Sequence, residues 1–300
     1  MAAQPMPAAE VEVSAELVRR LLAEQHPDLA GLAVRPGAHG WDNVTFRLGA
    51  KLAVRLPRRA LGATLIKHEQ QWLGRIAAGL PLPVPAPLRL GRPGCGYPWA
   101  WSVVPWFAGA PAAVAPPADP RAAAVTLAAF LAALHTSAPS DAPANPYRGV
   151  PLAARDELLT DRLATLGPQV DGAAVRRCWQ QALAVPGWAG PPLWLHGDLH
   201  PGNILTSRGR LTAVIDFGDL TAGDPAVDLS AAWMLLPAST HGAFRSAYAQ
   251  AAGYNVNTDV WDRARGWALA LSLAFLGGSA DHPPLAAVGR RTLDAALSIA

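Results

Sequence analysis

The chain has 300 residues, of which 51% are hydrophobic and 16% charged. This composition excludes general intrinsic disorder and predicts one large domain or two modest ones. The formal net charge is +3, but residues 1–106 carry 12 Lys and Arg against 7 Asp and Glu, whereas residues 107–300 carry 13 against 15. The uneven charge either suits an anionic ligand on the first part and a neutral or cationic one on the second, or reflects composition drift.

Disulfide scaffolds, membrane proteins and secreted proteins are disfavoured as classes. The two cysteines, Cys95 and Cys178, stand far apart and form neither a disulfide framework nor a CxxC motif. The longest apolar run, residues 267–278, is too short for a membrane span of about 20 residues. Residues 1–10 lack the basic start and apolar core of a signal peptide. We therefore expect a soluble cytoplasmic protein with no membrane partner, and nothing predicts nucleic-acid binding.

The first 105 residues predict a β-rich part. Residues 1–12 are expected to be a loose tail, and Ser14 is a plausible N-cap for the helix that follows. Alternating prolines force residues 80–87 into an extended conformation. The predicted elements are helices over 14–25 and 64–78, and short strands over 32–35, 43–48, 51–56, 88–90 and 99–104.

The pattern becomes helical after Pro105. Asp119-Pro120 is a typical helix start, and residues 137–151 form a Pro-rich linker. The predicted helices cover residues 119–136, 155–166, 172–184 and most of the chain from Pro225, with brief strands at 193–196, 204–206 and 211–215. The fold class is therefore α+β, with residues 1–105 and 106–300 as two parts.

Two motifs in the second part carry the chemistry. The first, His196-Gly-Asp-Leu-His-Pro-Gly-Asn203, is a loop between two predicted strands. The second places Asp216, followed by Phe and Gly, at the end of an apolar strand, where a bare carboxylate needs a cation. The Asp198 carboxylate is available to accept a proton, whereas Asn203 and Asp216 supply oxygen ligands for Mg²⁺. This layout is typical of phosphoryl transfer. The alternative is a zinc cluster of His196, Asp198 and His200, for which no further ligand motif is present.

An ion pair is predicted in the first part. Glu69 lies in the apolar stripe of a helix, where a carboxylate requires a buried cation. Ala53-x-Arg55 on the preceding strand matches the kinase pattern A-x-K with Arg in the Lys position. Arg55 and Glu69 are thus expected to pair and position phosphate. Alternatively, Glu69 is solvated at the edge of the stripe, or Lys51 or Lys67 is the phosphate ligand.

A glycine-bearing turn precedes these residues. Gly37 and Gly40 lie in a predicted loop over residues 36–42, where backbone N–H groups can hold phosphate oxygens.

These four features, in this order, resemble the aminoglycoside phosphotransferase family, the small-molecule relatives of protein kinases, over about residues 30–235. The motifs HGDLHPGN, IDFGD and DPAVDL are specific in combination. The resemblance implies a bilobal protein-kinase-like fold. Residues 1–105 would form a small nucleotide-binding lobe with an antiparallel sheet and one key helix, and residues 106–300 a larger, mainly helical lobe.

The resemblance also implies a role for each matching residue. Asp198 would be the catalytic base, and Asn203 and Asp216 would hold Mg²⁺ on the phosphates of ATP or GTP. Arg55, positioned by Glu69, would contact the α- and β-phosphates. His196 and Asp228 would brace the catalytic loop. The remaining nucleotide contacts would come from Gly37, Gly40, the hinge residues Val104 and Trp106, and the apolar residues Val34, Ala53 and Ile215.

Two positions depart from the family pattern. Arg55 replaces the usual lysine, which keeps the charge but changes its shape. Trp41 is bulky where a small residue is expected, and either covers the nucleotide or packs outward.

The expected function is an Mg²⁺-dependent O-kinase that uses ATP or GTP to phosphorylate a hydroxyl of a small molecule. The expected acceptor is an antibiotic of the aminoglycoside or macrolide type. The alternatives are an endogenous amino alcohol or sugar, or a non-catalytic nucleotide-binding protein. A protein kinase is disfavoured because no A-P-E segment follows Asp216. The candidate substrate contacts on the helical part are Asp219, Trp233, Trp261, Trp267 and Asp281.

Overall fold

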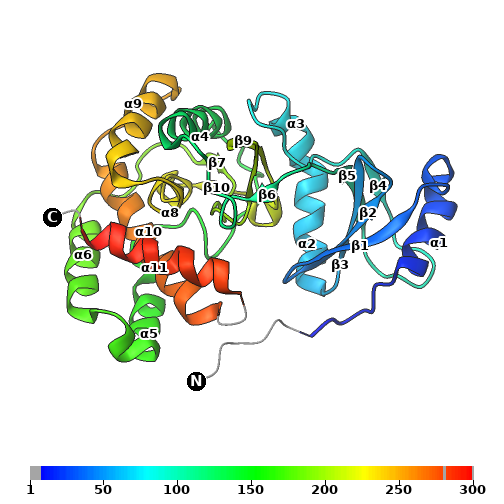
Figure 1. Cartoon of the computed structure of the whole chain (residues 1–300), viewed down its shortest axis with the longest axis horizontal. Coiled ribbons are helices and arrows are strands. Elements are labelled where there is room, and N and C mark those ends of the chain that lie inside the picture. The colour runs from blue at the N-terminus through cyan, green and yellow to red at the C-terminus, as the bar shows by residue number, and fades with distance from the viewer. Residues whose placement is uncertain (1–7, 280–281, 299–300) are drawn as a thin grey trace.

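The computed structural model describes residues 8–279 and 282–298 and has two lobes (Figure 1). A small lobe built around an antiparallel sheet stands beside a larger lobe built mainly of helices. The predicted α+β class and two-lobed architecture are therefore confirmed. Within the described residues, no helix is both long and apolar enough to cross a membrane.

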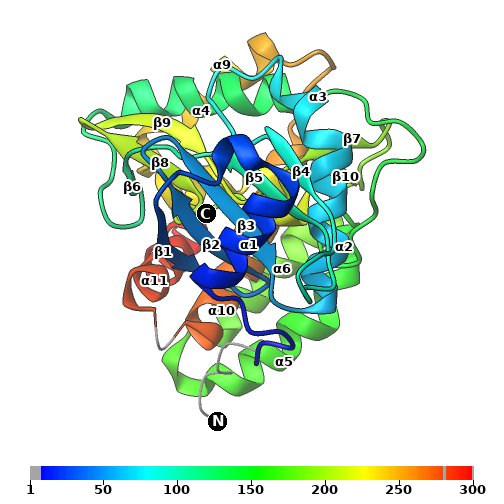
Figure 2. The same ribbon diagram turned by 90° about the vertical axis from the view of Figure 1, so that its right-hand side faces the viewer.

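The small lobe is a five-stranded antiparallel sheet in the order β1-β2-β3-β5-β4. Its elements are α1 (Ala15–Gln25), β1 (Val34–His39), β2 (Asn43–Leu48), β3 (Leu52–Pro57), α2 (Ala60–His68), α3 (Gly74–Ala77), β4 (Arg89–Gly91) and β5 (Trp101–Pro105). Helix α1 lies across one face of the sheet (Figure 2), where its leucines pack against Phe46 and Val54. Because side chains alternate along a strand, Arg55 points to the opposite face of β3.

Three predictions for this lobe need correction. Strand β1 continues through Gly37 to His39, with a register irregularity, so the glycine-bearing turn is shorter than expected. A Cβ on Gly37 would lie 2.6 Å from the carbonyl oxygen of Thr45, which explains the glycine. The predicted helix over 64–78 begins earlier, at Ala60, and includes a π-helical segment, Glu69–Leu73.

The predicted loose tail is also attached to the lobe. Residues 1–7 lie outside the described residues, but Glu10 is fixed by two hydrogen bonds. Its backbone N–H donates to the Arg58 carbonyl at 2.9 Å, and its carboxylate accepts from the Ala60 N–H at 2.9 Å. A carboxylate at the first turn of a helix satisfies an otherwise unpaired donor, so this residue caps α2.

The large lobe surrounds an insert of short strands over residues 193–223, here called the strand insert. Strands β6, β8 and β9 form one sheet, and β7 pairs with β10. The elements are β6 (Ala110–Pro111), α4 (Pro120–Leu134), α5 (Asp156–Leu166), α6 (Gly172–Ala184), β7 (Leu193–Leu195), β8 (Ile204–Ser207), β9 (Arg210–Val214), β10 (Thr221–Gly223), α7 (Ala226–Leu229), α8 (Ala231–Leu235), α9 (His241–Ala251), α10 (Asp259–Gly278) and α11 (Pro283–Leu297).

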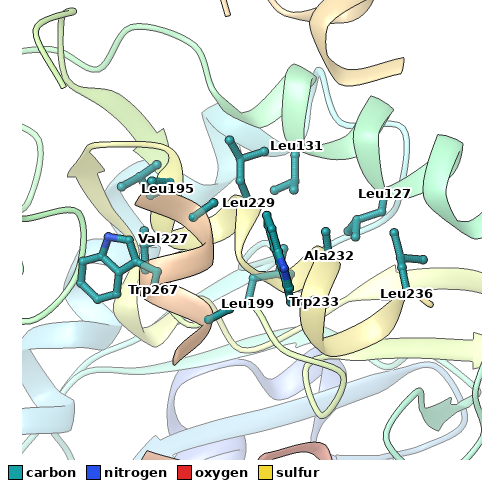
Figure 3. Packing of buried hydrophobic residues seen from close by; sticks show 14 of the residues in the cluster. Leu127, Leu131, Leu195, Leu199, Val227, Leu229, Ala232, Trp233, Leu236 and Trp267 are labelled. Carbon is teal, nitrogen blue, oxygen red and sulfur yellow. The ribbon is translucent and has the colours of Figure 1, made fainter. Parts of the chain in front are cut away.

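The largest hydrophobic core lies in this lobe and holds the strand insert against the helices. Trp233 and Trp267 lie among leucines from several elements, including Leu131 and Leu229 (Figure 3). Helix α10 is buried along most of its length, which explains why its sequence is apolar nearly all round. The loops between the short strands are therefore anchored to a rigid scaffold.

Candidate active site

The loop His196–Asn203 joins β7 to β8 and is held by one buried carboxylate. The Asp228 side chain is fully buried and accepts hydrogen bonds from the backbone N–H groups of His196, at 2.7 Å, and Gly197, at 2.9 Å. Gly197 has a φ of +85°, and a Cβ there would overlap the backbone of Asp219. The chain can thus turn sharply here only with glycine.

The ring of His196 joins the two motifs. Its Nδ1 accepts from the Asp198 N–H at 3.2 Å, so Nε2 carries the proton and donates to the Ile215 carbonyl at 3.0 Å. The Ile215 N–H in turn donates to the Asn203 carbonyl at 2.8 Å. Both ring nitrogens of His196 already form hydrogen bonds to the backbone, which argues against the zinc alternative. Among the described residues, no group of three His, Cys, Asp or Glu side chains could hold a metal ion.

Asp198 lies at the centre of the loop and contacts two cationic or polar partners. Arg148 Nη2 donates to its Oδ1 at 2.9 Å, and His200 Nε2 lies 3.5 Å from Oδ2. Burial raises the pKa of Asp198, but the His200 contact and the Arg148 charge outweigh burial and hold the pKa well below its usual range. Each carboxylate oxygen has two lone-pair sites, so Asp198 keeps capacity to accept a further hydrogen bond.

Asn203 and Asp216 present the oxygens expected for a hard cation. Asn203 Nδ2 donates to the Asp198 carbonyl at 3.0 Å, an orientation that leaves Oδ1 as an acceptor. Asp216 adopts a left-handed conformation, with φ 63° and ψ 67°, and its side chain is 55% exposed. A non-glycine residue in that region is strained, and such strain is common at functional sites. This donor set fits Mg²⁺.

The predicted ion pair between Arg55 and Glu69 is present. Arg55 Nη1 lies 2.5 Å from Glu69 Oε2, and Nη2 lies 3.1 Å from Asp216 Oδ1. Arg55 and Glu69 are both buried, and Glu69 sits on the first residue of the π-helical segment. Burial raises the pKa of Glu69 to about 7, although Arg55 draws it downward. The other carboxylate oxygen, Oε1, is buried without a hydrogen-bond partner in the described structure, which favours the protonated form.

The other candidate nucleotide contacts lie on the small lobe and the hinge. Ala53 on β3 is paired with Val104 on β5, and both are buried. The Trp106 N–H donates to the Lys51 carbonyl at 2.8 Å, so this N–H is engaged within the lobe. Gly40 donates to the Asn43 carbonyl at 2.9 Å and closes the turn beside Trp41, whose side chain is 51% exposed.

The candidate substrate contacts divide into two groups. Asp219 lies beside the catalytic loop, where it accepts a hydrogen bond from Asn145 at 2.6 Å, and burial followed by the Asp198 charge raises its pKa. The tryptophan expectations need correction because Trp233, Trp261 and Trp267 are only 3%, 7% and 0% exposed and belong to the core. Figure 3 shows Trp233 and Trp267 packed among core leucines. Asp281 lies outside the described residues.

Arg148 was not predicted from the sequence, although it contacts Asp198 directly. It lies within residues 137–151, which read as a Pro-rich linker. The signal that could have found it is the run Asn145-Pro-Tyr-Arg-Gly149, where polar and aromatic residues interrupt an Ala- and Pro-rich stretch. His135 was also missed: its Nε2 lies 3.3 Å from Asp228 Oδ2, and its Nδ1 lies 2.6 Å from the Tyr248 hydroxyl.

Comparison with known proteins agrees with this geometry. A model of the phosphotransferase enzyme family matches residues 33–267. Aminoglycoside 2'-phosphotransferase-IIIa in complex with GDP is 19% identical, with 95% of this chain and 99% of that chain covered at a TM-score of 0.68. Macrolide 2'-phosphotransferase from Brachybacterium faecium is 23% identical, with 95% and 98% covered at a TM-score of 0.63.

A third structure, a streptomycin–ATP ternary complex, is 20% identical, with 89% of this chain and 91% of that chain covered at a TM-score of 0.56. No curated protein sequence matches the chain. Identities this low show a shared fold, whereas the family model covers well over half of the residues and shows membership. The resemblance seen in the motifs is thus confirmed, and the protein belongs to the phosphotransferase enzyme family of small-molecule kinases.

Proposed function

We propose that this protein transfers the γ-phosphoryl group of ATP or GTP to a hydroxyl of a small molecule, with Mg²⁺ as cofactor. The observation that carries the proposal is the convergence of four side chains from both lobes. Arg55 reaches Asp216, Asn203 is bonded to the backbone of Asp198, and the two loops are joined through Ile215. A phosphoryl-transfer site needs this combination of a base, oxygen ligands and a fixed cation.

The proposed chemistry assigns one task to each group. Asp198 orients the acceptor hydroxyl and receives its proton as the hydroxyl oxygen forms its bond to the γ-phosphorus. The bond from phosphorus to the bridging oxygen breaks, and the nucleoside diphosphate leaves. Arg55, held by Glu69, contacts the phosphates. Mg²⁺, held by Asn203 and Asp216, would neutralise charge on the phosphate oxygens. Because the pKa of Asp198 is low, positioning contributes more than basicity.

The nucleotide and the acceptor are proposed at the level of class. Solved relatives are complexes with GDP, with ADP or with streptomycin and ATP, which supports both purine nucleotides as candidates. Other relatives are a kanamycin complex and a macrolide phosphotransferase, which supports an antibiotic acceptor. An endogenous hydroxylated metabolite is the alternative.

Nucleotide consumption by the purified protein tests the proposal. The assay uses Mg²⁺ with ATP and GTP separately, against aminoglycosides, macrolides, cyclic-peptide antibiotics and metabolite alcohols. Turnover that depends on both Mg²⁺ and an acceptor is the expected result. A protein that binds neither nucleotide in the presence of Mg²⁺ would contradict the proposal.

A further inference from the structure

The turn between β1 and β2, residues 40–42, is fixed to the start of α2. The Arg58 N–H donates to the Asp42 carbonyl at 2.8 Å, and Arg59 Nη2 donates to the Asp42 carboxylate at 2.8 Å. A Cβ on Gly62 would lie 2.6 Å from the Asp42 carbonyl oxygen, so α2 packs directly against the turn. These contacts hold the turn in one position.

The turn presents Trp41 to solvent. Its side chain is 51% exposed, and within the described residues its indole forms no hydrogen bond or ring contact. The bonds that fix the turn come from its neighbours, so the side chain of Trp41 is not needed to hold the backbone. A tryptophan on a fixed turn offers a ligand a large and rigid surface, because only two side-chain torsions remain to be ordered.

The sheet register places this turn beyond Arg55 as seen from the hinge. Ala53 pairs with β5 beside the hinge, and Arg55 lies two residues further along β3. Asn43, which borders the turn, pairs with Pro57, two residues further again. These levels follow one another at intervals of about 7 Å. A nucleotide with its base at the hinge and its phosphates at Arg55 therefore directs its terminal phosphate towards Trp41. In-line transfer brings the acceptor to the side away from the leaving group, which is the side of the turn.

The large lobe places Asp198 on the same side. His200 Nε2 lies 3.5 Å from Asp198 Oδ2, and the His200 ring lies 5.3 Å from the ring of Phe275 in α10. Phe275 in turn packs with Val288 of α11. In both views the turn end of β1 lies towards α11 (Figures 1 and 2). Trp41 and the proposed base therefore both lie on the acceptor side of the nucleotide.

We propose that Trp41 packs against the apolar face of a sugar ring of the acceptor, while Asp198 receives a hydroxyl of the same molecule. A sugar ring carries C–H groups on its faces and hydroxyls on its rim, so it can contact an indole and a carboxylate together. A polycationic acceptor gains no ion pair at the turn, because Asp42 is already paired with Arg59. This inference rests on the proposed function and makes Trp41 a specificity-determining residue for glycosides of low charge.

Titration calorimetry with Mg²⁺ and ADP tests the proposal, since ADP fills the nucleotide site without permitting transfer. The probe is erythromycin, a glycoside with methyl-bearing sugar rings and one amine. The comparison is kanamycin, whose sugar rings carry several amines. The wild-type protein should bind erythromycin more tightly than kanamycin. Trp41→Ala should raise the erythromycin dissociation constant at least about tenfold, as the loss of an aromatic anchor does, and Trp41→Phe should raise it less.

A matched control is available on the same lobe. Leu88 precedes β4 at the opposite edge of the sheet, and its side chain is 50% exposed. Leu88→Ala therefore removes an equally exposed apolar side chain and should bind erythromycin as the wild-type protein does.

Four results would overturn the inference. A tryptophan that covers the nucleotide would make Trp41→Ala weaken ADP binding, which should be unchanged. A preference for kanamycin that is lost in Trp41→Ala would assign Trp41 to cation recognition instead. The other two results are the absence of erythromycin binding and equal erythromycin binding by wild type and Trp41→Ala.

Failure of the proposed function is scored separately. ADP binding is measured first, and the erythromycin titration is repeated without nucleotide. A wild-type protein that binds no ADP would contradict the kinase proposal, whereas the comparison with Trp41→Ala would still be read from the titration without nucleotide.

Discussion

Arg55 contacts two carboxylates through different nitrogens. Nη1 contacts Glu69 on the small lobe, and Nη2 contacts Asp216 on the strand insert. A planar guanidinium presents two nitrogens in fixed directions, whereas a lysine has one nitrogen on a flexible stem. The arginine at this position therefore joins Glu69 to Asp216, the proposed Mg²⁺ ligand, through one planar group.

Replacing Arg55 by lysine tests this arrangement. Arg55→Lys keeps the charge but loses one of the two contacts, so the Michaelis constant for nucleotide should rise about tenfold, the effect of one charge-assisted hydrogen bond. Steady-state kinetics at varied nucleotide concentration measures the change. The exposed Arg19→Lys, the same change on α1 of the same lobe, serves as the control. An unchanged Michaelis constant in Arg55→Lys would show that only the charge matters.

Glu69 gives the site a pH dependence. Because its pKa is raised to about 7, it is protonated below that pH and charged above it. The charged form holds Arg55, so the Michaelis constant for nucleotide should fall as pH rises through about 7. Asp198 stays charged over this range because its pKa is low. Glu69→Gln should flatten the profile, and an identical inflection in that variant would assign it to another group.

The same pKa shift has the opposite sign for stability. A carboxyl group whose pKa is raised by folding contributes its full stabilisation below its ordinary value of 4.5 and loses it as pH rises through about 7. Glu69→Gln should therefore remove a decline in the free energy of unfolding between those pH values, as measured by urea denaturation.

At the residue scale, the candidate site residues that stand in short motifs could be predicted from their spacing along the chain. Asp198, Asn203 and Asp216 stand in two loops whose sequence identifies them, and the Arg55–Glu69 pair follows from a charge in an apolar stripe. Arg148 could not be predicted because its contact with Asp198 spans 50 positions and depends on docking of a segment without periodicity. The tryptophans were predicted to contact substrate but are buried in the core. An aromatic residue on a helix does not indicate whether its side chain faces the core or a substrate.

At the scale of elements, the catalytic loop depends on a buried brace. Asp228, in α7, accepts from two backbone N–H groups of the loop and lies 3.3 Å from the His135 ring. Asp228→Asn turns an amide towards these donors and leaves at least one unsatisfied, which should cost about 1–3 kcal/mol. Urea unfolding measures the loss, with exposed Asp294→Asn on α11 as the control. Equal stabilities of the two variants would rule out the brace.

Strand β10 holds the segment of residues 137–151 in place, because the Thr221 hydroxyl donates to the Pro143 carbonyl at 2.9 Å. A Cβ on Gly223 would overlap the carbonyl of Gly149, next to Arg148, whereas a Cβ on Gly253 has no neighbour within 4 Å. Gly223→Ala should therefore displace the segment and destabilise the protein by about 1–3 kcal/mol through overpacking, and Gly253→Ala should have little effect. Thermal unfolding of the two variants is the measurement, and similar midpoints would contradict the docking.

Which elements could be predicted follows from whether they carry a local apolar pattern of their own. Helices α1, α4, α5 and α6 carry enough apolar periodicity to be placed within a few residues. Helices α9, α10 and α11 were predicted only as a helical pattern from Pro225, without boundaries between them. Strands β6 and β10 have two and three residues and owe their conformation to their partners, so no local pattern marks them. The π-helical segment at Glu69 and the irregular register of β1 at Gly37 likewise arise from tertiary contacts.

At the scale of the whole molecule, few polar contacts connect the lobes at the site. Arg55 reaches Asp216, and the Val214 N–H donates to the Pro83 carbonyl at 3.1 Å. A bound nucleotide that contacts both lobes would add to these bonds, and ligand binding to the native state alone stabilises it. The small lobe is the more basic part, in keeping with an anionic nucleotide.

Asp198 is proposed to orient the acceptor hydroxyl and to receive its proton in a site assembled from both lobes. Comparing wild-type protein with Asp198→Asn in acceptor-dependent nucleotide turnover and in Mg²⁺–nucleotide binding tests this role. Turnover should fall by about 10²–10⁴-fold in the variant while nucleotide binding is preserved. Turnover at the wild-type rate in Asp198→Asn would show that this carboxylate has no part in the reaction.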